Sequence, residues 1–212
     1  LSFFKTQQKH LFRGSLMLRM LHIQTASTPN PACLKFSPGK AVTGDAGSTM
    51  DFSESKYASI SPLATNLFTI GGVIRVFYGK DFISVTKEEN STGTPEAGNH
   101  LKIEEHYASG LPLYIEDHDE RTDDLVINPD DSEALQMVKE INKQDATFRL
   151  EDGGDITFVE FNEETGVVYV ELKGSCAGCP SSAVTLKNGI ENMLKHYVAE
   201  VTSVQTIDPV AI

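Results

Sequence analysis

An acidic run at residues 116–133, EDHDERTDDLVINPDDSE, divides the chain into two parts. It contains nine acidic residues and a single arginine, and Pro129 interrupts it. Because like charges repel one another and few apolar side chains are available for burial, the run favours an extended linker that isolates two domains. A calcium loop is not indicated, since the glycine needed at its sixth position is missing. With 40% hydrophobic content, the 212 residues give each of two small domains enough material for a core.

The charge is unevenly distributed along the chain. Overall, 30 acidic residues outnumber 18 lysines and arginines, and a net charge of −12 argues against nucleic acid as a partner. Residues 1–44 reverse this balance, with six bases and no acid. Within residues 1–20, Phe4, Leu11 and Leu18 recur at helical spacing among the bases, which is typical of a mitochondrial transit peptide. A basic tail is the alternative. No apolar run approaches the roughly 18 residues that span a bilayer, so we expect a mitochondrial matrix protein with no membrane partner.

Residues 21–115 are expected to form a small α+β domain. Short alternating runs between turn-forming prolines, asparagines and glycines predict four strands, at residues 22–28, 33–39, 73–79 and 81–87. A short helix is expected to begin at Pro62 and to end before Gly71, and another short helix in 100–115 ends at Gly110. No nucleophile, base and orienting acid come together visibly in this half of the chain.

Residues 134–212 predict a second small domain with the element order α-β-β-α-β. The elements are a helix at 133–143, strands at 155–161 and 166–174, a helix at 181–198 and a strand at 201–207. Gly166 suits a left-handed turn between the first two strands. The sequence EDGGD at 151–155 is expected to form a tight turn that enters the first of them.

Cys176 and Cys179 lie in the sequence KGSCAGCPSS, between the second strand and the following helix. Three cysteines in the whole chain cannot form a disulfide framework, and an isolated C-x-x-C pair is more often metal-binding or redox-active than structural. This implies a reducing compartment. Pro180 suits the first turn of the helix, where the helix dipole and free amide hydrogens stabilise thiolates. The Gly-Ser and Pro-Ser-Ser flanks favour an exposed loop, and Gly178 allows both sulfurs to point the same way.

Two thiolates are too few for a complete site, because tetrahedral zinc sites and cubane clusters usually take four protein ligands. Cys33 supplies at most one more and is otherwise expected to be a core residue, while the six histidines are scattered. A symmetric dimer solves the count by presenting the same loop twice. Two alternatives stay open: a dithiol–disulfide oxidoreductase, although a hairpin rather than a βαβ unit precedes the pair, and a structural dimer bridged by zinc.

Several segments carry a resemblance to the Nfu family of iron–sulfur scaffold proteins. IQTASTPNPACLKFSPGKAV, SPLATNLFTIGGVIRVFYGKDFISVTK and SGLPL resemble the N-terminal domain of that family. LEDGGDITFVEF and VVYVELKGSCAGCPSSAVTLKNGIENMLKHYV resemble its NifU-like domain. The resemblance covers about residues 21–208, and by it Cys176 and Cys179 correspond to the cluster ligands. It implies a scaffold rather than an enzyme, with a [4Fe-4S] cluster held between two subunits, loaded by upstream assembly proteins and delivered to mitochondrial apo iron–sulfur proteins.

Overall fold

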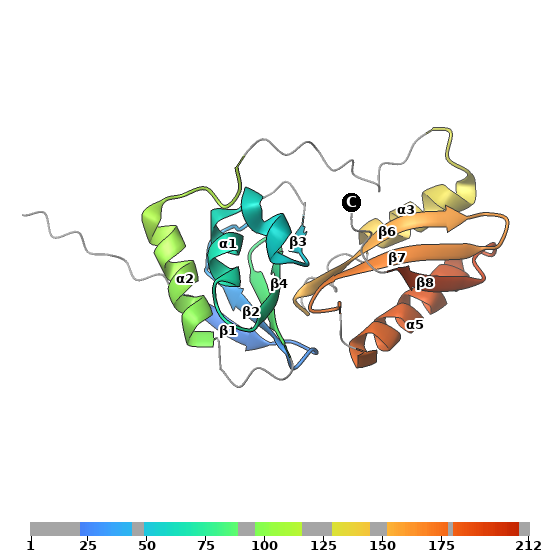
Figure 1. Cartoon of the computed structure of the whole chain (residues 1–212). Coiled ribbons are helices and arrows are strands. Elements are labelled where there is room, and N and C mark those ends of the chain that lie inside the picture. The colour runs from blue at the N-terminus through green and yellow to red at the C-terminus, as the bar shows by residue number, and fades with distance from the viewer. Residues whose placement is uncertain are drawn as a thin grey trace, which may run out of the picture.

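The computed structural model describes residues 22–43, 49–88, 96–115, 129–144, 152–177 and 180–207. These residues form two sheets with their own helices, which confirms the α+β class with two sheet-containing domains (Figure 1). The proposed transit peptide and most of the acidic run lie outside the described residues. None of the helices within the described ranges combines the length and the apolarity needed to cross a bilayer.

The N-terminal domain contains a five-stranded antiparallel sheet. Its strands are β1 (Gln24–Ser27), β2 (Cys33–Ser37), β3 (Met50–Phe52), β4 (Val73–Tyr78) and β5 (Ile83–Lys87), in the order β1-β2-β5-β4-β3. The helices are the 3-10 helix η2 (Ser55–Ile60), α1 (Pro62–Phe68) and α2 (Glu96–Ser109). The four expected strands and α1 are confirmed. The helix expected in 100–115 begins earlier, at Glu96, and β3 and η2 are short elements that local sequence patterns did not indicate.

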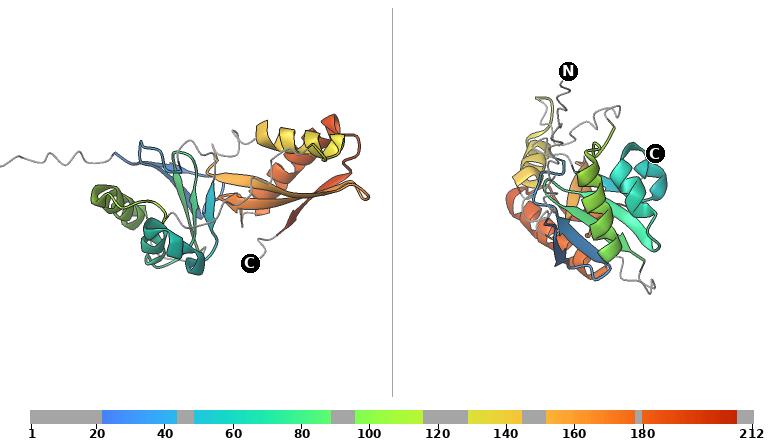
Figure 2. Two further views of the ribbon diagram at one scale, coloured as in Figure 1. Left: turned by 90° about the horizontal axis from the view of Figure 1, so that it is seen from above. Right: turned by 90° about the vertical axis from the view of Figure 1, so that its left-hand side faces the viewer.

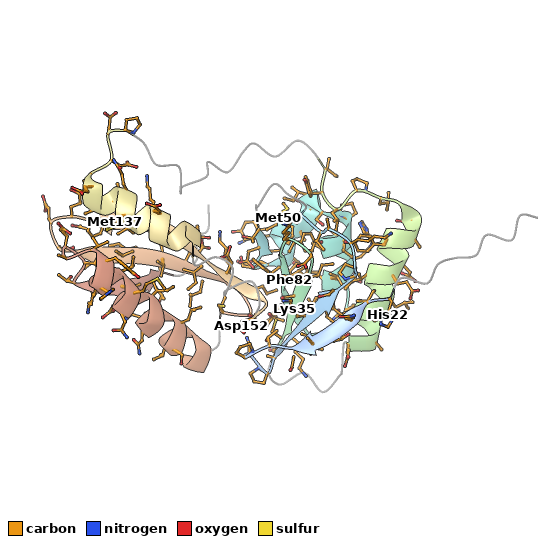
Figure 3. All side chains as sticks on the ribbon, turned by 180° about the vertical axis from the view of Figure 1, so that it is seen from behind. His22, Lys35, Met50, Phe82, Met137 and Asp152 are labelled. Carbon is orange, nitrogen blue, oxygen red and sulfur yellow. The ribbon has the colours of Figure 1, made fainter. Side chains whose placement is uncertain are left out.

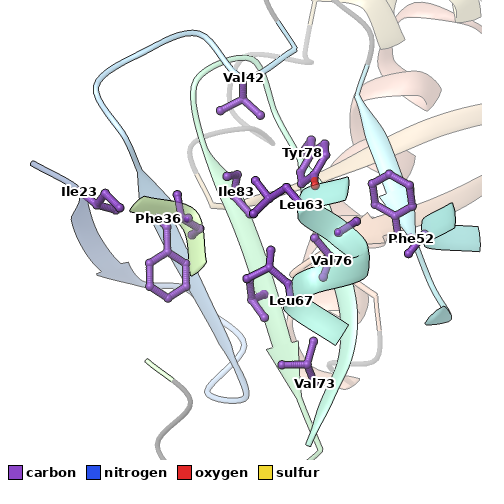
Figure 4. Close-up of a cluster of buried hydrophobic side chains, with 14 residues drawn as sticks. Ile23, Phe36, Val42, Phe52, Leu63, Leu67, Val73, Val76, Tyr78 and Ile83 are labelled. Atoms are coloured by element: carbon purple, nitrogen blue, oxygen red, sulfur yellow. The ribbon is translucent and has the colours of Figure 1, made fainter. Parts of the chain in front are cut away.

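Helix α1 is positioned by its first residues. The Ser61 side chain accepts a hydrogen bond from the backbone N–H of Ala64 at 3.1 Å, and Pro62 occupies the first turn, where its missing N–H costs nothing. The helix then turns Leu63 and Leu67 toward the sheet, where they pack with Val76 and other apolar strand residues (Figure 4). Burial of this apolar face holds the helices on one side of the sheet.

The C-terminal domain has the predicted order of elements. They are α3 (Glu133–Gln144), β6 (Gly154–Asn162), β7 (Val167–Gly174), α5 (Pro180–Tyr197) and β8 (Ser203–Ile207). Strands β6 and β7 form an antiparallel hairpin, and α5 carries the chain over to β8, which pairs parallel to β7. Helices α3 and α5 pack against the sheet around Val138, Ile190 and Leu194. Gly166 has a φ of +70°, as expected for the hairpin turn.

The β6–β7 hairpin reaches from its own domain toward the N-terminal sheet (Figures 1 and 2). Its open end, at the start of β6 and the end of β7, lies against the face of that sheet opposite to α1 and α2. The loop that carries Cys176 follows directly from this end, so the contact between the domains and the candidate site are adjacent.

Candidate metal centre

The loop after β7 is fixed to the open end of the hairpin by hydrogen bonds to backbone carbonyls. Ser175 N–H donates to the carbonyl of Gly153 at 3.2 Å, and Cys176 N–H donates to the carbonyl of Lys173 at 3.3 Å. The Ser175 hydroxyl also donates to the carbonyl of Asp152 at 2.7 Å. The expected tight turn at 151–155 is therefore present in its described part, and Gly153 takes a φ of +81° there. The carbonyls of this turn, at Asp152 and Gly153, accept both hydrogen bonds from Ser175 and so position the cysteine loop.

Cys176 is buried, with 4% of its surface exposed, and it belongs to the hydrophobic cluster of the C-terminal domain. Its sulfur lies so close to Gly154 that a Cβ at that position would come within 2.5 Å of it. Burial raises the pKa of the Cys176 thiol to about 11, and the nearby Asp152, Asp155 and Cys33 act in the same direction. The expectation of an exposed loop is thus wrong for Cys176, which is buried, and the raised pKa favours the thiol over the thiolate.

Cys179 lies outside the described residues, so the distance between its sulfur and that of Cys176 is not part of the structure. Helix α5 begins at Pro180, as the sequence predicted. The expected placement of the pair between a strand and a helix is therefore correct. Among the described residues, no group of three or more His, Cys, Asp or Glu side chains is arranged to hold a metal ion.

The two domains are in direct contact, and the expectation that the acidic linker isolates them is wrong. One face of the N-terminal sheet, which we call the docking face, receives the end of the hairpin; it consists of Cys33, Lys35, Asp51, Arg75, Phe77, Ser84 and Thr86. Figure 3 shows Lys35 and Phe82 of the N-terminal domain beside Asp152, which belongs to the tight turn that enters β6. An acidic linker between two domains does not prevent those domains from packing against one another.

Hydrogen bonds across this contact join residues far apart in the chain. The Ser84 hydroxyl donates to the carbonyl of Gly153 at 2.7 Å, and Asn30 donates from Nδ2 to the carbonyl of Ser175 at 3.3 Å. Beside them, the Thr49 hydroxyl donates to Oδ2 of Asp155 at 2.9 Å. Together with the bond from Gly174 to Asp51, these bonds join the hairpin end to the N-terminal domain at four points.

A buried ion pair completes the docking face. Arg75 Nη1 lies 2.7 Å from Oδ2 of Asp51, and the other carboxylate oxygen accepts from Gly174 N–H at 3.4 Å. Burial raises the pKa of Asp51, while Arg75 opposes that shift. Cys33, expected in the core, is buried with 1% exposure at the start of β2 and lies near enough to Cys176 to influence its pKa.

Local sequence patterns did not indicate the docking face. Its strands alternate between the two faces of the sheet, so Ser84 and Thr86 stand opposite Ile83 and Val85. One signal was available in the sequence: besides three charged residues, this face carries a serine, a threonine, a cysteine and Phe77. Small hydroxyl side chains suit a face against which another backbone packs closely.

Comparison with known proteins gives one family model for each of the two domains seen in the structure. Residues 23–93 match the family model described as scaffold protein Nfu/NifU N terminal, and residues 148–205 match the model of the NifU-like domain. NifU-like protein 5, mitochondrial, of Arabidopsis thaliana is 47% identical over 189 residues, which cover 88% of this chain and 68% of that protein. The chain belongs to the Nfu family of iron–sulfur cluster scaffold proteins.

Further members of the Nfu family align over most of the chain. NifU-like protein 4, mitochondrial, of Arabidopsis thaliana is 44% identical over 202 residues, covering 93% of this chain and 70% of the relative. The protein named NFU1 iron-sulfur cluster scaffold homolog, mitochondrial, of Drosophila persimilis is 45% identical over 201 residues, covering 92% and 68%. These names confirm the predicted mitochondrial localisation. The Nfu family consists of scaffold proteins and not enzymes, which excludes the oxidoreductase alternative. The assignment of Cys176 and Cys179 as cluster ligands stays a prediction.

Proposed function

We propose that this chain holds a [4Fe-4S] cluster between two copies of itself and delivers it to apo iron–sulfur proteins of the mitochondrial matrix. Cys176 and Cys179 of each copy supply the four thiolates. The observation that carries the proposal is the position of this pair between β7 and α5, inside the segment that matches the NifU-like domain of a scaffold family. Upstream assembly proteins supply the cluster.

The ligand count supports a bridging site. A cubane cluster takes four protein thiolates, and each copy offers one C-x-x-C pair. Cys33, the third cysteine of the chain, is buried in the docking face of the N-terminal domain, so we do not count it as a ligand. A ligand shell divided between two subunits opens when they separate, and this suits a carrier that must release its cluster.

Anaerobic reconstitution with iron and sulfide tests this proposal. We expect the reduced wild-type protein to become a brown dimer with about four irons per dimer. Cys176→Ser and Cys179→Ser should each fail to bind the cluster, because a hydroxyl is a poor ligand for iron, while Cys33→Ser serves as the matched control and should load normally. Metal analysis and absorption spectra distinguish the cluster from a single bridging zinc ion. Cluster loss in a correctly folded Cys33→Ser protein would refute the ligand assignment.

Loading should also be coupled to dimerisation. A cluster held by both subunits stabilises the dimer by its own binding free energy, so the apo-protein should dissociate at a higher concentration than the loaded form. Sedimentation of apo and loaded samples at matched concentration measures this difference, and chelation of the iron should return the monomer. A loaded monomer without added thiol would contradict the bridging arrangement.

A further inference from the structure

A polar sheet face that carries no helices is normally open to water, yet the docking face is closed. Ser84 is 1% exposed and Thr86 is 6% exposed. Helices α1 and α2 cannot cause this burial, because they pack on the opposite side with Val76, Ile83 and Val85. The hairpin end causes it: a Cβ added to Gly153 would lie 2.9 Å from the Ser84 hydroxyl, and one added to Gly174 would lie 2.9 Å from the Phe77 ring.

These contacts lie on both sides of Cys176. On one side, Asn30 binds the carbonyl of Ser175, the residue immediately before Cys176. On the other side, Ser84 binds Gly153, whose neighbour Gly154 lies against the Cys176 sulfur. The N-terminal domain is therefore bonded to both backbone segments that flank the Cys176 thiol, one at Ser175 and one at Gly153.

This arrangement is incompatible with a cluster shared between two subunits. A ligand sulfur in such a site must face outward to reach an iron whose other ligands belong to a second chain. Cys176 exposes 4% of its surface, and the backbone around it is already bound to the N-terminal domain. The docked chain and the bridged dimer thus require different environments for the same loop.

We propose that the N-terminal domain is a reversible cover for the cysteine loop, and that its docking face releases the hairpin end before Cys176 binds a cluster shared with a second subunit. The proposal rests on the proposed function in that Cys176 is taken to be a ligand. The one occupant of the docking face is the open end of the β6–β7 hairpin of the same chain, where Gly153 and Cys176 lie. The domain and the second subunit compete for the loop, so the apo monomer is the covered form and the loaded dimer is the open one.

Cysteine alkylation of the full-length apo-protein tests the cover without any iron. Reduced protein is treated with iodoacetamide at fixed pH, and the modification of Cys33 and Cys176 is followed separately by peptide mass spectrometry. Undocking exposes Cys33, which lies on the docking face, and it releases the backbone on both sides of Cys176, so that the loop around this thiol can open as well. A local opening of the loop exposes Cys176 alone. The rates follow the population of the open form when opening is fast relative to alkylation.

Two variants weaken the contact from different sides. Gly153→Asn adds a side chain against Ser84 and Thr28, and asparagine tolerates the positive φ of this position. Its matched control is Gly39→Asn, at a φ of +68° with no neighbouring atom within 4 Å of an added Cβ. Thr49→Asp places a second carboxylate opposite Asp155 and removes their hydrogen bond. A control for added charge is Thr206→Asp, at an exposed position of β8.

We expect Gly153→Asn and Thr49→Asp to accelerate alkylation of both Cys33 and Cys176 by about fivefold or more, as the loss of a single contact across the interface predicts. The two controls should match the wild type, and melting followed by circular dichroism should show that all four variants are folded. Unchanged rates in both interface variants, or acceleration at Cys176 without Cys33, would overturn the cover.

The loaded protein provides a second measurement, which separates this inference from the proposed function. Cys33 is not a proposed ligand, so loading should accelerate its alkylation relative to the apo-protein if the domain has undocked. A loaded dimer in which Cys33 stays as protected as in the apo-protein would show that docking persists, and the competition would be wrong. If no cluster loads at all, the proposed function fails, while the apo-protein result still decides whether the N-terminal domain covers the loop.

Discussion

Replacing Gly154 by alanine changes one methyl group at the closest approach between β6 and the cysteine loop. An alanine Cβ there would lie 2.5 Å from the Cys176 sulfur, 2.7 Å from the carbonyl oxygen of Lys173 and 2.8 Å from the backbone nitrogen of Cys176. Two of these three atoms are backbone, so they cannot rotate away as the end of a long side chain would. The substitution must therefore displace the start of β6 or the loop itself.

The expected cost follows from this crowding. Inserting a methyl group into a well-packed site typically destabilises a protein by about 1–3 kcal/mol. For a domain of roughly 60–100 residues, each kcal/mol lowers the melting temperature by about 4–8 °C. Because the displaced atom is the sulfur of a proposed ligand, we also expect the variant to retain less iron after reconstitution than the wild type.

Gly189→Ala is the matched control, since it makes the same chemical change in the same domain. Gly189 lies inside α5, and an added Cβ meets no atom within 4 Å. Alanine is favoured over glycine in a helix, so this variant should gain about 0.5–1 kcal/mol. Thermal melting of the reduced apo-proteins by circular dichroism compares the two. If Gly154→Ala melts at or above the wild-type temperature, the close packing of Gly154 on Cys176 is incorrect and the reasoning fails.

Three further substitutions test other parts of the structure. Arg75→Met leaves Asp51 buried without its ion-pair partner and should cost about 3–5 kcal/mol in denaturant unfolding; a loss below 1 kcal/mol would show that the pair is solvated. Ser61→Ala removes the cap of α1 and leaves the buried Tyr78 hydroxyl without its 2.8 Å partner, so we expect a loss of about 2–3 kcal/mol in the same assay, and an unchanged midpoint would contradict it. Burial lowers the pKa of His106 from its ordinary value of 6.5, so the unfolded chain binds the proton more readily and stability declines as the pH falls below about 6.5. His106→Leu should flatten that decline in melts between about pH 7.5 and 5, and an equal slope in both proteins would rule out His106 as its source.

The sequence by itself determined most of the regular elements. Strands at 73–79 and 81–87 were recognisable because local patterning and turn residues mark their ends, and α5 because its apolar residues recur with helical period. The cysteine pair was placed correctly between β7 and α5 for the same reason, since Gly174 ends one element and Pro180 begins the next. Each of these features depends on residues within a few positions of one another.

Only the tertiary structure decided the environment of Cys176. Its local sequence, with small and polar flanks, favoured an exposed loop, but Gly154 packs on its sulfur and Asn30 binds beside it from the other domain. Asn30 and Ser175 are 145 residues apart, and no periodic pattern connects them. The three-residue strand β3 likewise exists because it pairs with β4, and this pairing brings Asp51 next to Arg75. Contacts of this kind depend on the shapes of two folded surfaces, which form only after each local element is in place.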